Sequence, residues 1–296
     1  MNVLVTGGAG FIGSNLVDAL IAAEHHVRVL DNFSTGSRAY LNAKAELFEL
    51  DFTKLDAIRP AFVGVDTVFH VGALPRVPLS IDKPQETHLA NVDGTLNVLI
   101  ASRDAKVRRL VYSASSSAYG EQATLPLRED MRPNPMNPYA LQKYIGEEYC
   151  RLFSSLYGLE TVSLRYFNVY GPRMATVGAY VTVISVFRRQ KAAGETLTIV
   201  GDGEQTRDFT YVSDVVAANL AAMTSDRVGR GEVINIGAGD PHSVNEIAKY
   251  FGGPTTHLPA RPEARHTAAD IARAKNLLGW EPKVRFWNGV KQMLSV

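Results

Sequence analysis

A tyrosine and a lysine four residues apart are the side chains of this sequence best suited to proton transfer. Tyr139 and Lys143 lie in the segment PYALQK, and this spacing places both on one face of a helix. A phenol has a pKa near 10, and lowering that pKa by about three units requires about 4 kcal/mol. A cation at roughly 4 Å contributes about that much at an effective dielectric constant near 20. The pair therefore predicts a tyrosine that accepts a proton from an alcohol, with Lys143 stabilising the phenolate.

A second pair, Tyr40 and Lys44, has the same spacing in a different context. It lies in a polar stretch with no serine cluster before it. We expect these two side chains to be solvated on the surface. The spacing alone does not identify the reactive tyrosine, so its surroundings must.

Three consecutive serines supply the context of Tyr139. Ser115, Ser116 and Ser117 follow a β-branched run that ends near Ser113. In a doubly wound sheet, ligands bind at the carboxyl ends of the strands. We therefore expect Ser115 or Ser116 to orient the reacting hydroxyl of the substrate, and Ser117 to contact the substrate. The sequence leaves the choice between Ser115 and Ser116 open.

The glycine-rich segment TGGAGFIGS lies between an expected strand, residues 3–6, and an expected helix, residues 11–23. Its glycines satisfy G-x-G-x-x-G when counted from Gly8, and G-x-x-G-x-x-G when counted from Gly7. Without β-carbons they allow a tight turn, and a pyrophosphate can then approach the free N–H groups of the helix N-terminus. The segment predicts dinucleotide binding by Gly7, Gly10, Phe11, Ile12 and Gly13.

Acidic residues after the next two expected strands indicate which dinucleotide is bound. Asp31 ends the second strand, where a carboxylate accepts hydrogen bonds from the adenosine ribose and repels the extra phosphate of NADP. The following Asn32 is not the arginine that a 2′-phosphate requires. Asp51 and Phe52 end the third strand beside the expected adenine, although Asp51 also suits a helix N-cap. We expect NAD as the cofactor and no metal.

Short apolar runs alternate with helix-length amphipathic segments, as in repeated βαβ units. This rhythm predicts an α/β fold of the Rossmann type, with a doubly wound parallel sheet. The expected strands are residues 3–6, 27–30, 47–50, 67–71, 110–113, 161–165 and 230–236. The expected helices between them are residues 11–23, 54–62, 91–105 and 138–156.

The rhythm loosens after residue 167, where we expect a smaller, interleaved C-terminal subdomain. Residues 1–167, with about 208–236, form the predicted NAD-binding domain. About 168–207 and 237–296 form the predicted nucleotide-sugar-binding subdomain. Its segment LTIVGDGEQTRDFTYVSD reads as a strand, a Gly-rich turn and a returning strand, and the tail after residue 238 reads as two helices.

Composition limits the class of partner. The 296 residues are 46% hydrophobic and 21% charged, with a net charge of +1 and scattered basic residues. We therefore expect no nucleic acid and no membrane as partner. The single cysteine, Cys150, excludes an intrachain disulfide, and the first residues lack the pattern of a secretory leader. We expect a cytoplasmic protein with Cys150 in the core.

Together, TGGAGFIG, the Asp31 position, SASSSAYG, YALQK and RYFNVYGPR resemble the extended short-chain dehydrogenase/reductase family, and within it the UDP-hexose 4-epimerases. The resemblance implies removal of hydride from C4 of a UDP-sugar, a transient 4-keto intermediate, and return of hydride to its other face. It implies Tyr139 as base, Lys143 as its cofactor-side partner, and Ser115 as the catalytic hydroxyl with Ser116 as rival. Tyr166 is a further cofactor contact by the same resemblance.

The resemblance also implies the substrate contacts. Arg207 and Arg261 correspond to arginines that hold the UDP diphosphate, and Asn168 to an asparagine beside it. Thr267 stands where a small residue admits an N-acetyl group, so we expect UDP-GlcNAc/UDP-GalNAc, UDP-Glc/UDP-Gal, or both. Arg76 and Arg173 are further substrate candidates, and together they keep a UDP-glucuronic acid-type 4-epimerase as an alternative.

Other activities of the same fold fit less well. Dehydratases of the family carry an acid–base pair where this chain has Ser116 and Ser117. A net sugar-nucleotide reductase usually prefers NADPH, which Asp31 disfavours. A non-catalytic NAD-binding sensor would not need Tyr139 and Lys143. The resemblance further implies a homodimer formed through residues 91–105 and 138–156. Asn91 matches a family residue near the active site, and it also suits a helix N-cap.

Overall fold

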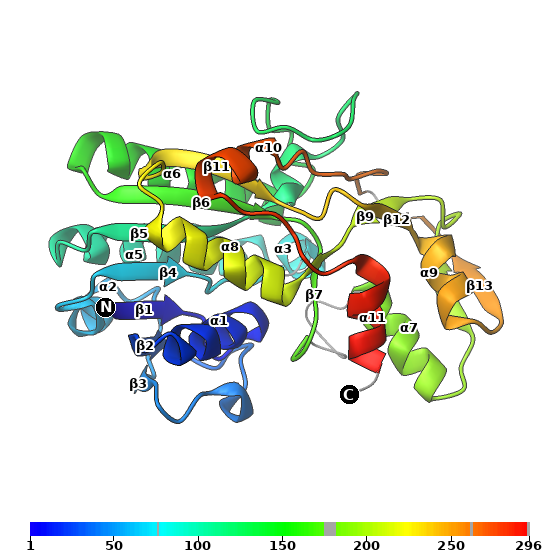
Figure 1. The fold of residues 1–296 in the computed structure, drawn as a ribbon, viewed down its shortest axis with the longest axis horizontal. Coiled ribbons are helices and arrows are strands. Elements are labelled where there is room, and N and C mark those ends of the chain that lie inside the picture. The colour runs from blue at the N-terminus through cyan, green and yellow to red at the C-terminus, as the bar shows by residue number, and fades with distance from the viewer. Residues whose placement is uncertain (76, 175–181, 261–262, 295–296) are drawn as a thin grey trace.

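The fold is built on one parallel sheet of seven strands in the order β11-β6-β5-β4-β1-β2-β3 (Figure 1). The computed structural model describes residues 1–75, 77–174, 182–260 and 263–294. The bounds of the seven strands are β1 Asn2–Thr6, β2 His26–Leu30, β3 Glu46–Phe48, β4 Thr67–His70, β5 Arg109–Ser115, β6 Glu160–Tyr166 and β11 Arg230–Ile236. The order confirms the predicted doubly wound topology, because all pairs within the sheet are parallel.

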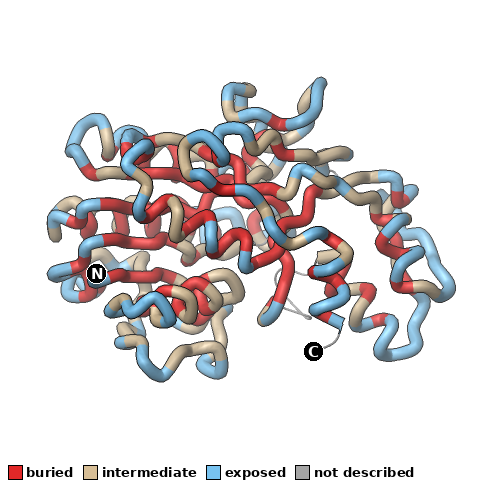
Figure 2. Tube along the Cα trace, in the orientation of Figure 1, coloured by how far each residue is buried: buried red, intermediate tan, exposed pale blue. Residues whose placement is uncertain are grey.

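Helices cover both faces of this sheet, because successive strand residues point to opposite sides. Val3 and Val5 pack toward one face, and Leu4 between them packs toward the other. The first face is covered by α1 (Phe11–Ala22), α8 (Val212–Thr224) and α10 (Ala272–Leu278). The second is covered by α2 (Leu55–Ile58), α5 (Gly94–Asp104) and α6 (Pro138–Tyr157). Figure 2 shows the strands buried along nearly their whole length between these layers.

A smaller lobe lies beyond the carboxyl ends of the strands (Figure 1). It has its own apolar core, which includes Phe187, Phe209, Ile247 and Phe286. Its elements are β7 Val169–Tyr170, α7 Val183–Ala192, β8 Leu197–Val200, β9 Thr206–Asp208, β10 Thr210–Tyr211, β12 Pro241–Ser243, α9 Val244–Phe251, β13 Thr255–Leu258 and α11 Phe286–Leu294. These elements come from two separated stretches of the chain, and the division into two functional domains stays a prediction.

The lobe differs from the sequence prediction in its strand partners. β8 and β9 both exist, but they do not form the expected hairpin. Instead β8 pairs in parallel with β13, and β9 pairs antiparallel with β12. The tail contains three helices within the described residues, α9, α10 and α11, rather than two. Strand partners distant in sequence cannot be read from a local pattern, which explains the first error.

Two predicted helices on the second face are also divided. The expected helix 54–62 becomes α2 followed by a 3-10 turn, Arg59–Phe62, with Pro60 at its start. The expected helix 91–105 begins instead as a π-helical segment, Leu89–Asp93, that runs into α5. Two short helices were not predicted, α3 (Val77–Asp82) and α4 (Pro84–His88). The two short helices and the π-helical segment follow the carboxyl end of β4, where the chain leaves the sheet.

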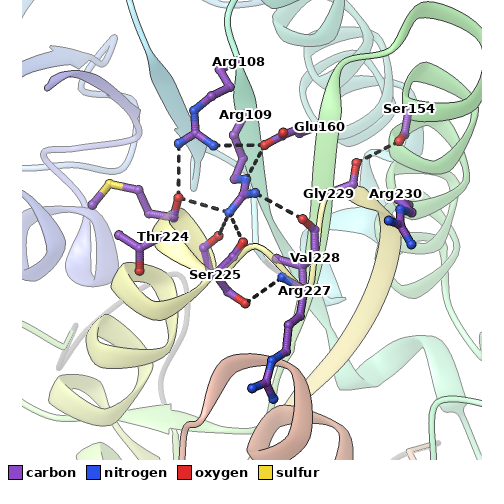
Figure 3. A network of polar contacts seen from close by, with 12 residues as sticks. Arg108, Arg109, Ser154, Glu160, Thr224, Ser225, Arg227, Val228, Gly229 and Arg230 are labelled. Carbon is purple, nitrogen blue, oxygen red and sulfur yellow. Dashed lines mark hydrogen bonds and ion pairs between the residues drawn. The ribbon is translucent and has the colours of Figure 1, made fainter.

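The amino ends of the central strands are held by a buried arginine (Figure 3). Arg109, the first residue of β5, is 3% exposed, and its Nε donates to Glu160 at 2.8 Å. Its terminal nitrogens donate to four carbonyl oxygens at the end of α8 and just after it, those of Ala222, Met223, Ser225 and Val228. A cation at a helix C-terminus compensates carbonyls that have no partner within the helix. Arg109 therefore fixes α8 to the sheet at the end remote from the lobe.

A search of the described residues for a helix that could cross a membrane found none that is both long and apolar enough.

Candidate active site

A cleft of about 1340 Å³ lies between the carboxyl edge of the sheet and the smaller lobe. Three kinds of residue line it: the glycine turn after β1, the loops after β2 to β6, and residues of the lobe. All but one of the predicted site residues that the structure describes line this cleft: Gly7, Gly10, Phe11, Ile12, Gly13, Asp31, Asn32, Asp51, Phe52, Ser115, Ser116, Ser117, Tyr139, Lys143, Tyr166, Asn168, Arg207 and Thr267.

The glycine turn has the shape that a pyrophosphate requires. Gly7 has φ +69°, and a β-carbon there would lie 2.6 Å from the Cα of Gly72. A β-carbon on Gly13 would collide with the carbonyl oxygen of Gly7. No side chain caps the first turn of α1, whose N-cap is Gly10, so its amides face the cleft uncapped. This cradle of amides fits a dinucleotide phosphate.

The structure also distinguishes the two glycine patterns. Gly7, Gly10 and Gly13 line the cleft. A β-carbon on Gly8 would instead meet the side chain of Val29 at 2.8 Å, so Gly8 allows the turn to pack on β2. The pattern counted from Gly7 is therefore the one that faces a ligand.

Asp31 is held rigidly at the end of β2. Its carboxylate oxygens accept hydrogen bonds from the amides of Ala9 at 2.9 Å and Phe33 at 2.8 Å. A carboxylate has about four acceptor positions, so two contacts leave capacity for ribose hydroxyls. The first bond also ties the Asp31 loop to the glycine turn. Asn32 beside it accepts from the Ser34 amide at 3.0 Å.

Asp51 and Phe52 have different roles at the adenine end. Asp51 accepts from the Thr53 amide at 2.9 Å and shapes a turn, whereas the N-cap of α2 is Lys54. The N-cap alternative for Asp51 is therefore wrong. A β-carbon on Gly72 would lie 2.7 Å from the ring of Phe52, and a β-carbon on Gly94 would lie 2.5 Å from it. Phe52 thus packs against the loop after β4 and the start of α5, as well as lining the cleft.

The serine turn forms a local hydrogen-bonded unit at the end of β5. Ser115 is the N-cap of a 3-10 turn, Ser116–Tyr119, and its Oγ accepts from the Ser117 amide at 3.2 Å. The Ser117 hydroxyl donates to the same Oγ at 2.8 Å. With both contacts used as an acceptor, Ser115 retains its own proton to donate to a ligand. The Ser115 hydroxyl is thus held by two contacts, and the choice between Ser115 and Ser116 as the catalytic hydroxyl stays a prediction.

The reactive pair lies on the first two turns of α6. Asn137 caps this helix by accepting from the Ala140 amide at 2.9 Å, and the buried Ser80 accepts from the Tyr139 amide at 3.1 Å. Lys143 is buried, with its Nζ 4.6 Å from the centre of the Tyr112 ring. Burial lowers the pKa of Lys143 to about 8, while the charge of Glu147 raises it. The caps and the helix therefore present a phenol and a poorly solvated ammonium to the same cleft.

Nearby titratable groups are structural. His70 lies between two threonine hydroxyls, Thr6 at 2.7 Å and Thr95 at 3.0 Å, and burial lowers its pKa to about 3. Tyr166 bonds to Ser113 at 3.1 Å and to Asn219 at 2.9 Å, and burial raises its pKa to about 12. Both side chains are neutral at pH 7, so neither supplies charge to the reactive pair.

The lobe contributes polar groups to the opposite wall. Arg207 pairs with Glu263 at 3.2 Å and donates to the carbonyl of Arg265 at 3.0 Å. Asn168 has φ +27° and donates to the carbonyl of Asp208 at 3.2 Å. The Thr267 hydroxyl accepts from the Asp208 amide at 3.3 Å. These groups bring one cation and several polar side chains to the lobe face of the cleft.

The structure does not bring Arg173 into the cleft. Its guanidinium pairs with Asp18 of α1 at 2.7 Å and lies 5.8 Å from the centre of the Tyr40 ring. It therefore joins the lobe to α1 instead of facing a substrate. The predicted contacts Arg76 and Arg261 lie outside the described residues.

Sequence reasoning missed several residues of the cleft. Arg189 on α7 lines it, and its only signal in the sequence is a basic residue on an amphipathic helix. Leu74 also lines it and is fixed by Asn91, which accepts from its amide at 2.8 Å and donates to its carbonyl at 3.1 Å. Asn91 also donates to Gln142 of α6 at 2.9 Å. It therefore connects the loop at Leu74 to α6 and is not a helix cap.

Several known proteins are similar to this chain over nearly its whole length. A putative UDP-glucose 4-epimerase of Methanocaldococcus jannaschii is 40% identical over 99% of this chain and 97% of its own length. The UDP-glucose 4-epimerase of Thermotoga maritima, solved with UDP-glucose, is 39% identical with a TM-score of 0.94 over 100% of this chain and 98% of that one. The UDP-N-acetylglucosamine 4-epimerase of Methanobrevibacter ruminantium, solved with UDP-N-acetylmuramic acid, is 34% identical with a TM-score of 0.93 over 99% and 97%.

The family itself follows from a match over most of the chain. Residues 3–237 match the model of the NAD dependent epimerase/dehydratase family. The matched region contains the glycine turn, the serine turn and the Tyr139–Lys143 pair. This chain belongs to the NAD dependent epimerase/dehydratase family.

Proposed function

We propose that the protein is an NAD-dependent 4-epimerase of a UDP-hexose, acting on UDP-Glc/UDP-Gal, UDP-GlcNAc/UDP-GalNAc, or both. One observation carries the proposal: a single cleft joins the glycine turn to Ser115, Tyr139 and Lys143, and Ser116 and Ser117 stand where a dehydratase needs an acid and a base. Epimerisation needs only one base and a returning hydride.

The proposed proton path starts at the C4 hydroxyl of the sugar. Ser115 donates a hydrogen bond that orients this hydroxyl, and the Tyr139 phenolate accepts its proton. Lys143 stabilises the phenolate by its charge. Returning the proton from Tyr139 to the C4 oxygen completes the cycle, so the protein is regenerated without net gain or loss of protons.

The glycine turn and Asp31 hold the cofactor in this proposal. The uncapped amides of α1 bind the pyrophosphate and Asp31 binds the adenosine ribose. NAD, when bound, supplies the hydride acceptor that takes the C4 hydrogen and gives it back to the other face. Tyr166 and Phe52 line the same cleft. In this proposal their rings exclude water from the bound cofactor.

The lobe binds the nucleotide-sugar in this proposal. Arg207 exchanges its contact with Glu263 for the diphosphate, which binds arginine in a bidentate manner. Asn168 and Thr267 contact the nucleotide and the sugar. A neutral hexose is favoured over a UDP-uronic acid because Arg173, one of two arginines considered for a sugar carboxylate, is engaged with Asp18.

A substrate panel tests the function. The purified protein is incubated with UDP-Glc, UDP-GlcNAc or UDP-GlcA, and the products are separated by nucleotide-sugar chromatography. We expect the C4 epimer of UDP-Glc or UDP-GlcNAc without added reductant. Turnover of UDP-GlcA alone identifies the uronic acid alternative. No turnover of any of the three contradicts the proposal.

We further propose a homodimer formed through residues 91–105 and 138–156. Leu141, Leu152 and Leu156 of α6 are exposed by 47%, 38% and 66%, and they leave an apolar stripe on the outer side of this helix. Light scattering after size exclusion measures the mass, and Leu156→Glu should shift it toward the monomer.

We also keep the division into an NAD-binding part and a nucleotide-sugar part, and a cytoplasmic location, as proposals.

A further inference from the structure

A buried ion pair lies directly behind the reactive pair. Glu147 of α6 and Arg165 of β6 are 1% and 2% exposed, and they form a bidentate contact. Arg165 Nε donates to Glu147 Oε1 at 2.9 Å, and Nη2 donates to Oε2 at 2.7 Å. Because both carboxyl oxygens accept hydrogen bonds from one guanidinium, the geometry is that of an ionised carboxylate.

The position of Glu147 on the helix relates it to catalysis. Tyr139, Lys143 and Glu147 are spaced by four residues, so they follow one another along one face of α6. Tyr139 and Lys143 line the cleft, whereas Glu147 is one turn deeper and does not. Its partner Arg165 lies beyond it, 4.4 Å from the centre of the Tyr119 ring at the end of the serine turn. The negative end of the ion pair thus faces Lys143.

The other titratable groups packed around Lys143 carry no charge at pH 7. His70 on β4 has a pKa lowered to about 3 by burial. Tyr112 on β5 has a pKa raised well above its ordinary value, and Cys150 on α6 has one raised to about 12, both by burial. Tyr139 is the group that Lys143 serves. Among the described residues, Glu147 is therefore the fixed negative charge that acts on Lys143, with Arg165 beyond it.

We propose that Glu147 is a positioning residue for the reaction: its carboxylate, fixed by Arg165, keeps the buried Lys143 ammonium charged and directed toward Tyr139. This inference rests on the proposed function, because it assigns the ion pair to the proton transfer of Tyr139. Lys143 acts on the phenol only while it is protonated. A buried amine loses its proton readily, so an anion one helical turn away maintains the working state.

Fold stability alone does not explain this ion pair. Two buried charges lose hydration, and apolar side chains of similar volume often stabilise such a position equally well. Arg165 also contacts Tyr119 at the end of the serine turn. Tyr119 is held by an uncharged contact as well, because its hydroxyl donates to Asn235 at 2.7 Å. What an apolar pair cannot supply is a negative charge beside Lys143.

The test is the pH dependence of Glu147→Gln, which removes the charge and keeps the shape. We expect the alkaline limb of kcat for the substrate that the wild type turns over to move about one to two pH units downward. KM should stay within about two-fold, because Glu147 does not reach the cleft. The pKa of the Lys143 amine, followed by NMR in protein without substrate, should fall by a similar amount.

Glu148→Gln is the matched control on the same helix. Glu148 pairs with exposed Arg151 at 2.9 Å on the outer side of α6. Its removal should leave both the kcat profile and the Lys143 titration unchanged. A Glu147→Gln protein whose alkaline limb and Lys143 titration match the wild type overturns the inference.

A second variant tests the inference if the Glu147→Gln protein does not fold. If Glu147→Gln leaves Arg165 unpaired and unfolds the chain, the double variant Glu147→Gln/Arg165→Met removes both charges. Smaller shifts in the same direction are expected in it, because the loss of the Arg165 charge offsets part of the loss of Glu147, and their absence likewise overturns the inference. Inactivity of the wild type contradicts the proposed function instead, and the NMR titration then still tests the effect of Glu147 on Lys143.

Discussion

The two ends of the central sheet treat a buried cation in opposite ways. At the amino end, Arg109 donates to one carboxylate and four carbonyl oxygens, and it joins β5 to α8 (Figure 3). At the carboxyl end, Lys143 lies against the face of Tyr112, and burial lowers its pKa to about 8. The first cation is solvated by the protein, and the second is not fully solvated.

This difference separates a structural charge from a chemical one. A cation whose donors are all satisfied stabilises the fold and has nothing left for a ligand. An incompletely solvated ammonium destabilises the fold, and it responds strongly to a phenolate that forms beside it. The cleft therefore carries a cost in stability that the amino end of the sheet does not.

The largest expected effect is on activity at the cleft end. Tyr139→Phe should lower kcat by about 10³-fold or more, because it removes the base and leaves the ring. The midpoint of thermal unfolding should change little. Tyr40→Phe is the control, since it alters the other Tyr-x-x-x-Lys pair. Epimerase assays and calorimetry on both variants check the prediction, and an active Tyr139→Phe would contradict the assignment. A variant that loses turnover but still binds NAD also separates an enzyme from a sensor.

The next effect is on stability at the amino end. Arg109→Met should lower the free energy of unfolding by about 2–4 kcal/mol, because it leaves buried carbonyls at the end of α8 and just after it without their donor. Its neighbour Arg108 contacts the same Glu160 at 3.0 Å but is 46% exposed, so Arg108→Met should cost less than about 1 kcal/mol. Urea unfolding measures both. The kcat of the folded Arg109→Met protein should equal that of the wild type, and equal losses in the two variants would argue against the role of burial.

A smaller effect distinguishes the two candidate serines. Ser115→Ala should lower kcat by about 10- to 100-fold, since Ser115 has a proton left to donate. Ser116→Ala should change kcat by less than about 3-fold. Steady-state kinetics on the pair give the ratio. The reverse ranking would assign the catalytic hydroxyl to Ser116.

The smallest effect is a gain in stability. The pKa of Lys143 in the folded protein, about 8, lies below its ordinary value of 10.5. The unfolded chain therefore binds more protons between these values, and this group makes the wild type more stable as pH rises through them. Lys143→Met removes the penalty, so at pH 7 it should be more stable than the wild type by about 1–3 kcal/mol. Urea unfolding at pH 7 and pH 10 should show the advantage shrinking at pH 10, and a variant less stable at pH 7 contradicts the comparison.

Most of the fold and much of the cleft could be predicted from local patterns. The apolar run of β1 and the glycines before α1 indicate a strand, a turn and a helix within a few residues, so these elements could be predicted from the local sequence. The position of Tyr139 and Lys143 on one face of a helix could be predicted for the same reason. The predicted hairpin of β8 and β9 failed because their partners, β13 and β12, come from distant parts of the chain.

The arginines show the same limit. Arg173, Arg189 and Arg207 are all basic residues of the second half, and nothing in their local sequence ranks them. Packing turns Arg173 toward Asp18 and places Arg189 and Arg207 on the cleft. The Glu147–Arg165 pair was likewise invisible, because its two residues meet only when α6 packs on β6.

The amino-acid sequence by itself determined the alternation of strands and helices, the glycine turn and the spacing of phenol and ammonium, since backbone conformation and helical periodicity act over a few residues. Only the tertiary structure decided which glycine faces the cleft, which groups hold the Ser115 hydroxyl, and which charges surround Lys143. Those properties depend on desolvation and on contacts between segments far apart in the chain, and no local pattern encodes either.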